Sequence, residues 1–204
     1  MSEIPLSFSE LEAAARAVIE ILQGIPELSS AKIAIIGGMT LWKYLQSYRT
    51  TKDVDFLITV QGAPATVKNK LLALPNSPFS QPAQVFSYKG LNGRPVQIDI
   101  TPDWQSPYLP DAAVPVSAVQ LNSLPYISAL DLLVFKINCC GLRADMSKKA
   151  QDATDARTLL EHIRAQGPIV LAPSQKTTVL QGLDDVAQYS FRDVAWWKTQ
   201  LCLT

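Results

Sequence analysis

The hydrophobic positions near the start of the chain follow a helical period. Five apolar residues recur every three or four positions, as they do on one face of an α-helix: Leu11, Ala15, Val18, Ile19 and Leu22. Ser7 and Ser9 each precede a glutamate by three positions, which is the arrangement of a capping box. Gly24 is a suitable stop after the last apolar position. The sequence therefore predicts a helix that ends at about Gln23 and packs one face on a core.

Short apolar runs after this helix predict strands that alternate with helices. Strands are expected over 32–36, 52–60, 83–89 and 95–101, and helices over 39–48 and 65–74. The Asn92-Gly93 pair between the last two strands is typical of a hairpin turn. From residue 102 to residue 125 prolines are frequent, and we expect irregular loops and short edge strands there.

The pattern becomes helical from Ser128 onward. We expect helices over 128–140, 147–165 and 174–189, each starting at a serine cap, and a short last helix that contains Trp196 and Trp197. Gly141 and Gly167 are expected to end the first two. This order predicts an α+β protein with a mixed β-sheet. Its sheet domain, with the N-terminal helix, would span 1–127, and a C-terminal helical part over 128–204 would pack on it to form one compact unit.

Composition narrows the chemistry that the chain can support. The chain has 204 residues, of which 48% are hydrophobic, and its 18 basic residues balance its 18 acidic ones. A single histidine, His162, excludes zinc sites that need two or three imidazoles. The three cysteines form no C-x-x-C pair, so we expect no structural zinc and no disulfide framework. Any catalysis should therefore depend on carboxylates, amines and hydroxyls.

The same features bear on location and partners. The first residues lack the basic and apolar regions of a signal peptide, and no apolar run reaches the ~18 residues of a membrane span. We expect a cytoplasmic protein with reduced thiols and no membrane partner. The zero formal net charge indicates no extended binding of nucleic acid, although a short RNA end is not excluded.

Carboxylates are the most informative polar residues in the predicted strands. In Asp53-Val54-Asp55 the two aspartates share one face of a strand, because side chains alternate, while Val54 points to the other face. Asp99 interrupts another apolar strand and is the candidate for a third carboxylate, with Asp103 on the following loop as its competitor. If the two strands are neighbours, three carboxylates meet and can bind Mg²⁺ or Mn²⁺ together with phosphate oxygens.

A glycine pair fits the same chemistry. Gly37-Gly38 follows a predicted strand and precedes a helix, so it would offer bare backbone amides to a triphosphate. The Thr40 hydroxyl is a further candidate donor, and Arg49 is a candidate for bidentate contact with a phosphate. Each of these signals is weak alone, and their order along the chain is what makes them specific.

Together these motifs resemble the nucleotidyltransferase superfamily of DNA polymerase β. The residues that carry the resemblance are Gly37-Gly38, Asp53-Val54-Asp55 and Gln97-Ile98-Asp99. The stretch 37–41 together with 49–56 is similar to the AbiEii-type branch, and uncharacterised fungal nucleotidyltransferase-like proteins look similar as well. The D-L-h-x-h-K pattern that ends at Lys136 and the D-x-x-D of Asp152 and Asp155 also look like that branch.

This resemblance implies a fold and a reaction. The fold would be a mixed-sheet nucleotidyltransferase fold with helices packed on it and a C-terminal helical part. The resemblance implies that Asp53 and Asp55 bind metal, that Asp99 is the third carboxylate and base, and that Lys136 contacts a phosphate. The enzyme would bind a nucleoside triphosphate such as ATP with Mg²⁺ or Mn²⁺. It would transfer the nucleoside monophosphate to a hydroxyl of an RNA end, a protein or a small molecule.

Other interpretations of the same residues remain open at this point. A catalytically lapsed relative would serve as a nucleotide-binding or interaction module. A glycosyltransferase with a metal-binding Asp-x-Asp is less favoured, since here the apolar strand follows the two aspartates. A dinucleotide-binding site is disfavoured because G-x-G-x-x-G is never completed. For Asp152 and Asp155 the simplest interpretation is a set of ion pairs on a helix surface with Lys148, Lys149 and Arg157.

Overall fold

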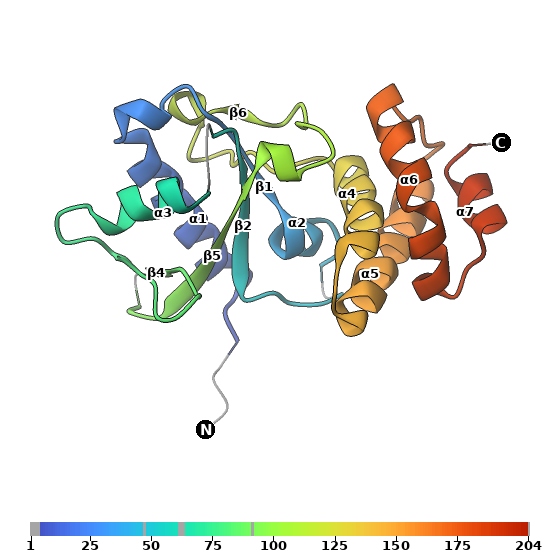
Figure 1. Cartoon of the computed structure of the whole chain (residues 1–204), viewed down its shortest axis with the longest axis horizontal. Helices are drawn as coiled ribbons and strands as arrows, with labels where there is room; N and C mark the ends of the chain where they lie inside the picture. The colour runs from blue at the N-terminus through green and yellow to red at the C-terminus, as the bar shows by residue number, and fades with distance from the viewer. Residues whose placement is uncertain (1–4, 47, 61–63, 91, 204) are drawn as a thin grey trace. The chain divides into compact units, whose positions relative to one another are not determined.

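The computed structural model describes residues 5–46, 48–60, 64–90 and 92–203 (Figure 1). These residues form two compact units, which divide between Ile127 and Ser128. Unit 1 comprises residues up to Ile127 and contains the whole sheet, and unit 2 begins at Ser128 and is helical.

Unit 1 is built on one mixed sheet with the strand order β3-β4-β5-β2-β1-β6. The strands are β1 (Lys32–Ile36), β2 (Asp53–Ile58), β3 (Phe79–Ser80), β4 (Ser87–Lys89), β5 (Pro95–Pro102) and β6 (Val114–Pro115). The β2–β5 pair is parallel, and all the other neighbours are antiparallel. The sheet therefore places two strands that are distant in sequence, β2 and β5, directly side by side.

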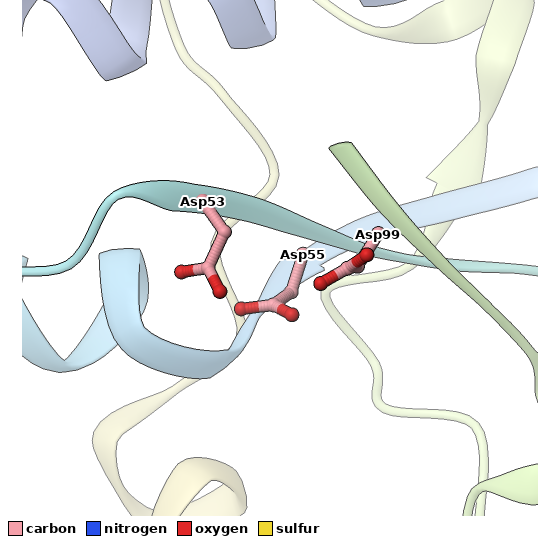
Figure 2. A group of neighbouring side chains, drawn as sticks. All are labelled: Asp53, Asp55 and Asp99. Carbon is pink, nitrogen blue, oxygen red and sulfur yellow. The ribbon is translucent and has the colours of Figure 1, made fainter. Parts of the chain in front are cut away.

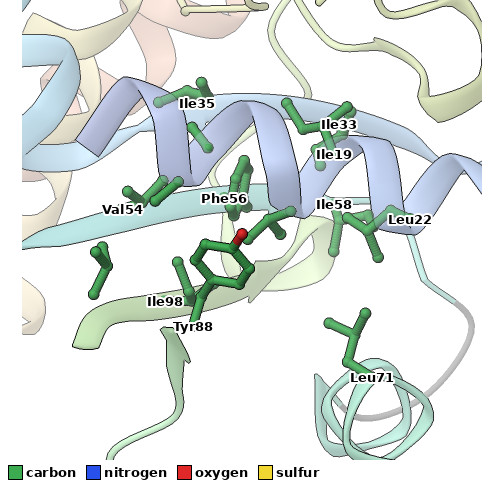
Figure 3. Packing of buried hydrophobic residues seen from close by; sticks show 14 of the residues in the cluster. Ile19, Leu22, Ile33, Ile35, Val54, Phe56, Ile58, Leu71, Tyr88 and Ile98 are labelled. Atoms are coloured by element: carbon green, nitrogen blue, oxygen red, sulfur yellow. The ribbon is translucent and has the colours of Figure 1, made fainter. Parts of the chain in front are cut away.

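Helix α1 (Phe8–Gln23) covers one face of this sheet. Its N-terminus has the predicted capping box, in which the Ser7 hydroxyl accepts from the Glu10 N–H and the Glu10 carboxylate accepts from the Ser7 N–H. Figure 3 shows Ile19 and Leu22 above the sheet, in the cluster that also holds Phe56 of β2. Burial of these side chains removes apolar surface from water and fixes which face of the sheet is internal.

The remaining elements of unit 1 agree in type with the sequence predictions but differ in length. Helix α2 (Gly37–Tyr44) starts at the glycine pair itself, two residues earlier than expected, and α3 (Pro64–Leu72) ends earlier than expected. The predicted 83–89 strand is reduced to β4, because Ala83 has a positive φ of 54° and turns the chain. The hairpin from β4 to β5 is present; its residue 91 lies outside the described residues.

Short 3₁₀ helices fill the connections of unit 1, and β6 is a short edge strand in the proline-rich stretch. The 3₁₀ helices are Pro26–Leu28, Asp103–Gln105 and Val116–Ala118. The short strand β3 was not predicted, since two residues carry too little pattern to be recognised.

Unit 2 consists of the helices α4 (Ala129–Leu142), α5 (Met146–Arg164), α6 (Pro173–Ser190) and α7 (Val194–Gln200). The first three pack against one another, and α7 packs on α6. At Gly182 of α6 a Cβ atom would lie 2.8 Å from the Ile137 carbonyl oxygen of α4. Glycine at this position therefore allows the close approach of the two helices.

Some predicted helix ends in unit 2 were wrong. Ser128 does cap α4, but the N-cap of α5 is Asp145, and α6 begins with Pro173 after Ala172. Gly141 does not end α4, which continues to Leu142. The absence of a Cβ at Gly141 makes room for the Asp185 carboxylate. Across the described ranges, no helix combines the length and the apolar character needed to cross a bilayer.

Candidate metal centre

The two aspartates of β2 lie on the face of the sheet opposite α1. The burial pattern of the strand alternates at its start: Asp53 and Asp55 are half-buried, whereas Val54 and Phe56 belong to the buried core. Residues two apart on a strand share a face, so packing of Val54 and Phe56 under α1 directs both carboxylates to the other side.

The third carboxylate comes from β5 through the parallel pairing. Asp99 is the register partner of Asp55, and both side chains are half-buried. One oxygen atom from each of Asp53, Asp55 and Asp99 lies within 4.8 Å of the corresponding atoms of the other two. Figure 2 shows the three carboxylates on one side of the two strands. Asp103, the competitor for the third position, is not a member of this group.

Neutral donors from unit 1 contact each of the three carboxylates. The Thr51 hydroxyl donates to Oδ1 of Asp53. The Gly38 N–H donates to Oδ2 of Asp55 at 3.3 Å, and Nε2 of Gln97 donates to Oδ2 of Asp99 at 2.9 Å. These donors orient the carboxylates without cancelling their charge.

The glycine pair lets the N-terminus of α2 approach this group closely. Gly37 has a φ of 68°, in the left-handed region, and a Cβ there would overlap the Asp55 carboxylate at 1.9 Å from Oδ2. At Gly38 a Cβ would lie 2.6 Å from the Thr51 hydroxyl oxygen. Thr51 therefore occupies the space that a side chain at position 38 would need. Both glycines are required by local geometry.

The other predicted nucleotide contacts in unit 1 have different surroundings. Thr40 is fully buried, and its hydroxyl donates to the Ile35 carbonyl at 2.9 Å, which ties the first turn of α2 to β1. Arg49 is half-buried in the connection between α2 and β2, and its Nη1 donates to the Thr50 carbonyl at 3.3 Å. The predicted phosphate contact of Arg49 stays a prediction.

Lys136 belongs to a second cluster of charges, inside unit 2. Its ammonium lies 2.6 Å from Oδ1 of Asp152 and 2.9 Å from Oδ2 of Asp155, and Nε of Arg143 lies 2.9 Å from Oδ2 of Asp152. Asp152 and Asp155 are 3% and 0% exposed, so the interpretation of a helix-surface ion pair was wrong for both. Their partner is the lysine of α4, which the spacing within α5 alone does not indicate. The phosphate contact of Lys136 stays a prediction.

Electrostatics explain why this second cluster can stay ionised. Burial lowers the pKa of Lys136, but the Asp152 and Asp155 carboxylates outweigh burial and raise that pKa above its usual 10.5. Burial likewise raises the pKa of Asp152, yet the Lys136 ammonium and the Arg143 guanidinium hold it below 3.8. The cluster is thus a buried network of ion pairs that satisfies its own charges.

The three carboxylates of unit 1 suit a divalent cation. Carboxylate oxygens are hard ligands of the kind that Mg²⁺ and Mn²⁺ prefer. Neither Asp53 nor Asp99 forms a salt bridge in the described part of the chain, so no ion pair among these residues offsets the charge of the two groups. The donor set therefore fits a divalent metal bound by Asp53, Asp55 and Asp99.

Thr51 and Gln97 are the members of this centre that the sequence patterns missed. Gln97 alternates with buried Val96 and Ile98, so its place on the face of Asp99 is implied by strand period. Its hydrogen bond to Asp99 is a side-chain contact that the period does not predict. Thr51 lies before the strand, where no periodicity applies, and only its spacing of two from Asp53 hinted at a contact.

Comparison with known proteins adds to this geometry. No protein-family profile and no curated protein matches the chain. Among solved structures, the chain is similar to an antigenic nucleotidyltransferase-like protein from Paracoccidioides brasiliensis, with a TM-score of 0.63 and 18% sequence identity. The match covers 98% of this chain and 95% of the other. The chain has a nucleotidyltransferase-like fold. The predicted α+β class with a mixed sheet and a helical C-terminal part is thereby confirmed, whereas membership of the AbiEii-type branch stays a prediction.

Proposed function

We propose that this chain is a divalent-metal-dependent nucleotidyltransferase. The observation that carries the proposal is the group of three carboxylates, Asp53, Asp55 and Asp99, on two neighbouring strands of a nucleotidyltransferase-like fold. A metal held by these residues would neutralise charge on the phosphates of a nucleoside triphosphate. The glycine pair beside the carboxylates supports the proposal, because it brings a helix N-terminus close to them.

The reaction assigns a step to each group of residues. An acceptor hydroxyl attacks the α-phosphorus of the nucleoside triphosphate, and a new P–O bond forms as the bond to pyrophosphate breaks. Asp99 accepts the proton of the attacking hydroxyl as general base. Asp53 and Asp55, together with Asp99, would hold the metal, and pyrophosphate leaves with the electron pair of the broken bond.

The nucleotide contacts follow from the surroundings of each candidate. Gly37 and Gly38 place the N-terminus of α2 beside the carboxylates, where the Gly38 N–H donates to Asp55. Arg49 would contribute a guanidinium for a phosphate. The phosphate contact of Lys136 stays a prediction, since its ammonium already pairs with Asp152 and Asp155 in unit 2. We leave Thr40 out of the proposed contacts, since its buried hydroxyl already donates to the Ile35 carbonyl.

Incubation of the protein with each labelled nucleoside triphosphate, beginning with ATP, and with Mg²⁺ or Mn²⁺ tests the proposal. RNA ends, protein hydroxyls and small-molecule hydroxyls such as aminoglycosides are the acceptor classes to supply. We expect metal-dependent nucleotide binding and label transfer in the wild type, both lost in Asp53→Ala and Asp55→Ala. Absence of metal-dependent binding in the wild type would sink the enzyme hypothesis. Binding that survives in both variants would contradict the site.

Binding without transfer to any acceptor would point to the other function that the same site supports. The chain would then be a nucleotide-binding module of this fold that no longer transfers the nucleotide. The enzyme and the binding module both show metal-dependent nucleotide binding at Asp53 and Asp55. They differ only in whether the label is transferred to an acceptor.

A further inference from the structure

Four side-chain positions form a square on the face of the sheet that carries the carboxylates. The parallel register pairs Asp53 with Gln97 and Asp55 with Asp99. Partners in a parallel ladder present their side chains to the same face, about 4.8 Å apart at the backbone. Three corners of the square are thus acidic, and the fourth, Gln97, is a neutral amide.

The amide of Gln97 is bonded to one neighbour in the square. Its Nε2 lies 2.9 Å from Oδ2 of Asp99, and Gln97 is half-buried. An ionised carboxylate only accepts hydrogen bonds, so the nitrogen must be the atom that faces Asp99. This bond restricts rotation of the Asp99 carboxylate. Asp99 forms no salt bridge with a described residue.

The chemistry of the fourth corner matters for a bound cation. A fourth carboxylate there would add repulsion to three negative charges, and a lysine or arginine would neutralise one of them and compete with a metal. An amide donates one hydrogen bond and leaves the charge in place. Residues that bond to metal ligands in this way commonly raise metal affinity, and their loss costs about 10- to 100-fold.

We propose that Gln97 is a positioning residue, which holds the Asp99 carboxylate in the orientation needed to share a divalent cation with Asp53 and Asp55. This inference rests on the proposed function, since it assumes that the three carboxylates bind metal. It assigns Gln97 no contact with the metal or the nucleotide. Its effect passes through Asp99 alone.

Titration of the full-length protein with Mn²⁺, followed by calorimetry or by electron paramagnetic resonance of free Mn²⁺, tests the inference. Gln97→Met keeps the length of the side chain and removes the donor. We expect it to weaken Mn²⁺ binding by about tenfold or more. Thr101→Val is the matched control: Thr101 also lies two residues from Asp99 on the same face of β5, and no hydrogen bond joins the two in the described chain. It should bind Mn²⁺ as the wild type does.

The thermal unfolding midpoint in EDTA separates positioning from structure. We expect the midpoint of Gln97→Met to stay within about 2 °C of the wild type, because the residue is half-buried and only one hydrogen bond is removed. If Gln97→Met lowers the midpoint but binds Mn²⁺ with wild-type affinity, Gln97 is structural and the inference is overturned. If Gln97→Met does not fold, Gln97→Asn decides in the same way, since its amide is one methylene too short to reach Asp99.

The outcomes also distinguish this inference from the proposed function. A wild type that binds Mn²⁺ together with a Gln97→Met variant of equal affinity overturns the positioning role alone. A wild type that binds no Mn²⁺ overturns the proposed function and the positioning role together.

Discussion

The protein contains two groups of aspartates whose charges are handled in opposite ways. In unit 1, Asp53, Asp55 and Asp99 are half-buried, and the donors that contact them include a hydroxyl, a backbone amide and a side-chain amide. In unit 2, Asp152 and Asp155 are buried, and the Lys136 ammonium lies between them. Buried carboxylates need a cation from the chain itself, because desolvation is costly.

The difference agrees with the proposed role of the unit 1 group. The chain supplies the cation where the carboxylates are structural, inside a helical packing core. At Asp53 and Asp99 the contacts from the described residues are neutral hydrogen bonds, which orient the oxygens and leave their charge available to an external cation. A carboxylate that is held in place but not neutralised is what a metal centre requires.

The largest effect is expected when the metal group itself is changed. Asp55→Asn keeps the shape of the side chain and removes a charge, and we expect it to lower nucleotide transfer by about a thousandfold, since metal catalysis contributes several kcal/mol. Steady-state transfer of a labelled nucleoside monophosphate measures it. Asp103→Asn is the matched control, because Asp103 lies just beyond β5, the strand of Asp99, but outside the group, and it should keep wild-type activity. Equal losses in both variants would contradict the assignment of the group.

The second prediction breaks the neutralised group instead. Lys136→Met leaves Asp152 and Asp155 buried without their ammonium, and we expect a loss of about 3–5 kcal/mol in the free energy of unfolding. Urea unfolding followed by tryptophan fluorescence measures it. Lys148→Met, on the exposed surface of α5, should change stability by less than about 0.5 kcal/mol. A small effect of Lys136→Met would show that the two groups do not differ in this respect.

The third prediction concerns the effect of a bound divalent cation on the stability of the protein. Mn²⁺ at about 100 times its dissociation constant should stabilise the folded protein by about 2.7 kcal/mol, because the ion binds the folded state preferentially. Thermal unfolding in EDTA and in Mn²⁺ measures the shift. The shift should vanish in Asp53→Asn and persist in Asp152→Asn. A shift of equal size in Asp53→Asn would place the bound ion elsewhere.

The fourth prediction concerns how the stability contributed by Asp152 of unit 2 depends on pH. The pKa of Asp152 in the folded state lies below the ordinary 3.8, so the folded state binds fewer protons than the unfolded state as pH falls past that value. The stability that Asp152 contributes is therefore complete above pH 3.8 and is lost as pH falls through the lowered pKa. We expect Asp152→Asn to cost about 2 kcal/mol at pH 7, as for hydrogen bonds to charged groups.

The difference in the free energy of unfolding between wild type and Asp152→Asn should disappear as pH falls below 3.8, and urea unfolding at several pH values measures it. Asp184→Asn, at an exposed position of α6, is the control and should change the free energy of unfolding by less than about 0.5 kcal/mol at pH 7. A difference that is constant down to pH 2 would mean that the Asp152 carboxylate does not contribute through its charge.

Local patterns predicted most elements, because helix and strand periods are properties of neighbouring residues. The capping box at Ser7, the strand β1 and the alternation in β2 all follow from such patterns. Two of the errors lie where a distant contact decides. The spacing of Asp152 and Asp155 resembled a helix surface, yet α4 packs over them and pairs them with Lys136. Likewise, Gly141 does not end α4, and the Asp185 carboxylate packs where its side chain would be.

The sequence by itself determined that Asp53 and Asp55 share a strand face and that a glycine pair precedes a helix, because both depend on residues close together in the chain. Only the tertiary structure decided that Asp99, and not Asp103, joins them, since this depends on the parallel register of β2 and β5. The same register put Gln97 beside Asp53, and the folded loop put Thr51 over Gly38. Pairing between distant strands is set by the burial of whole faces under α1, which no local pattern contains.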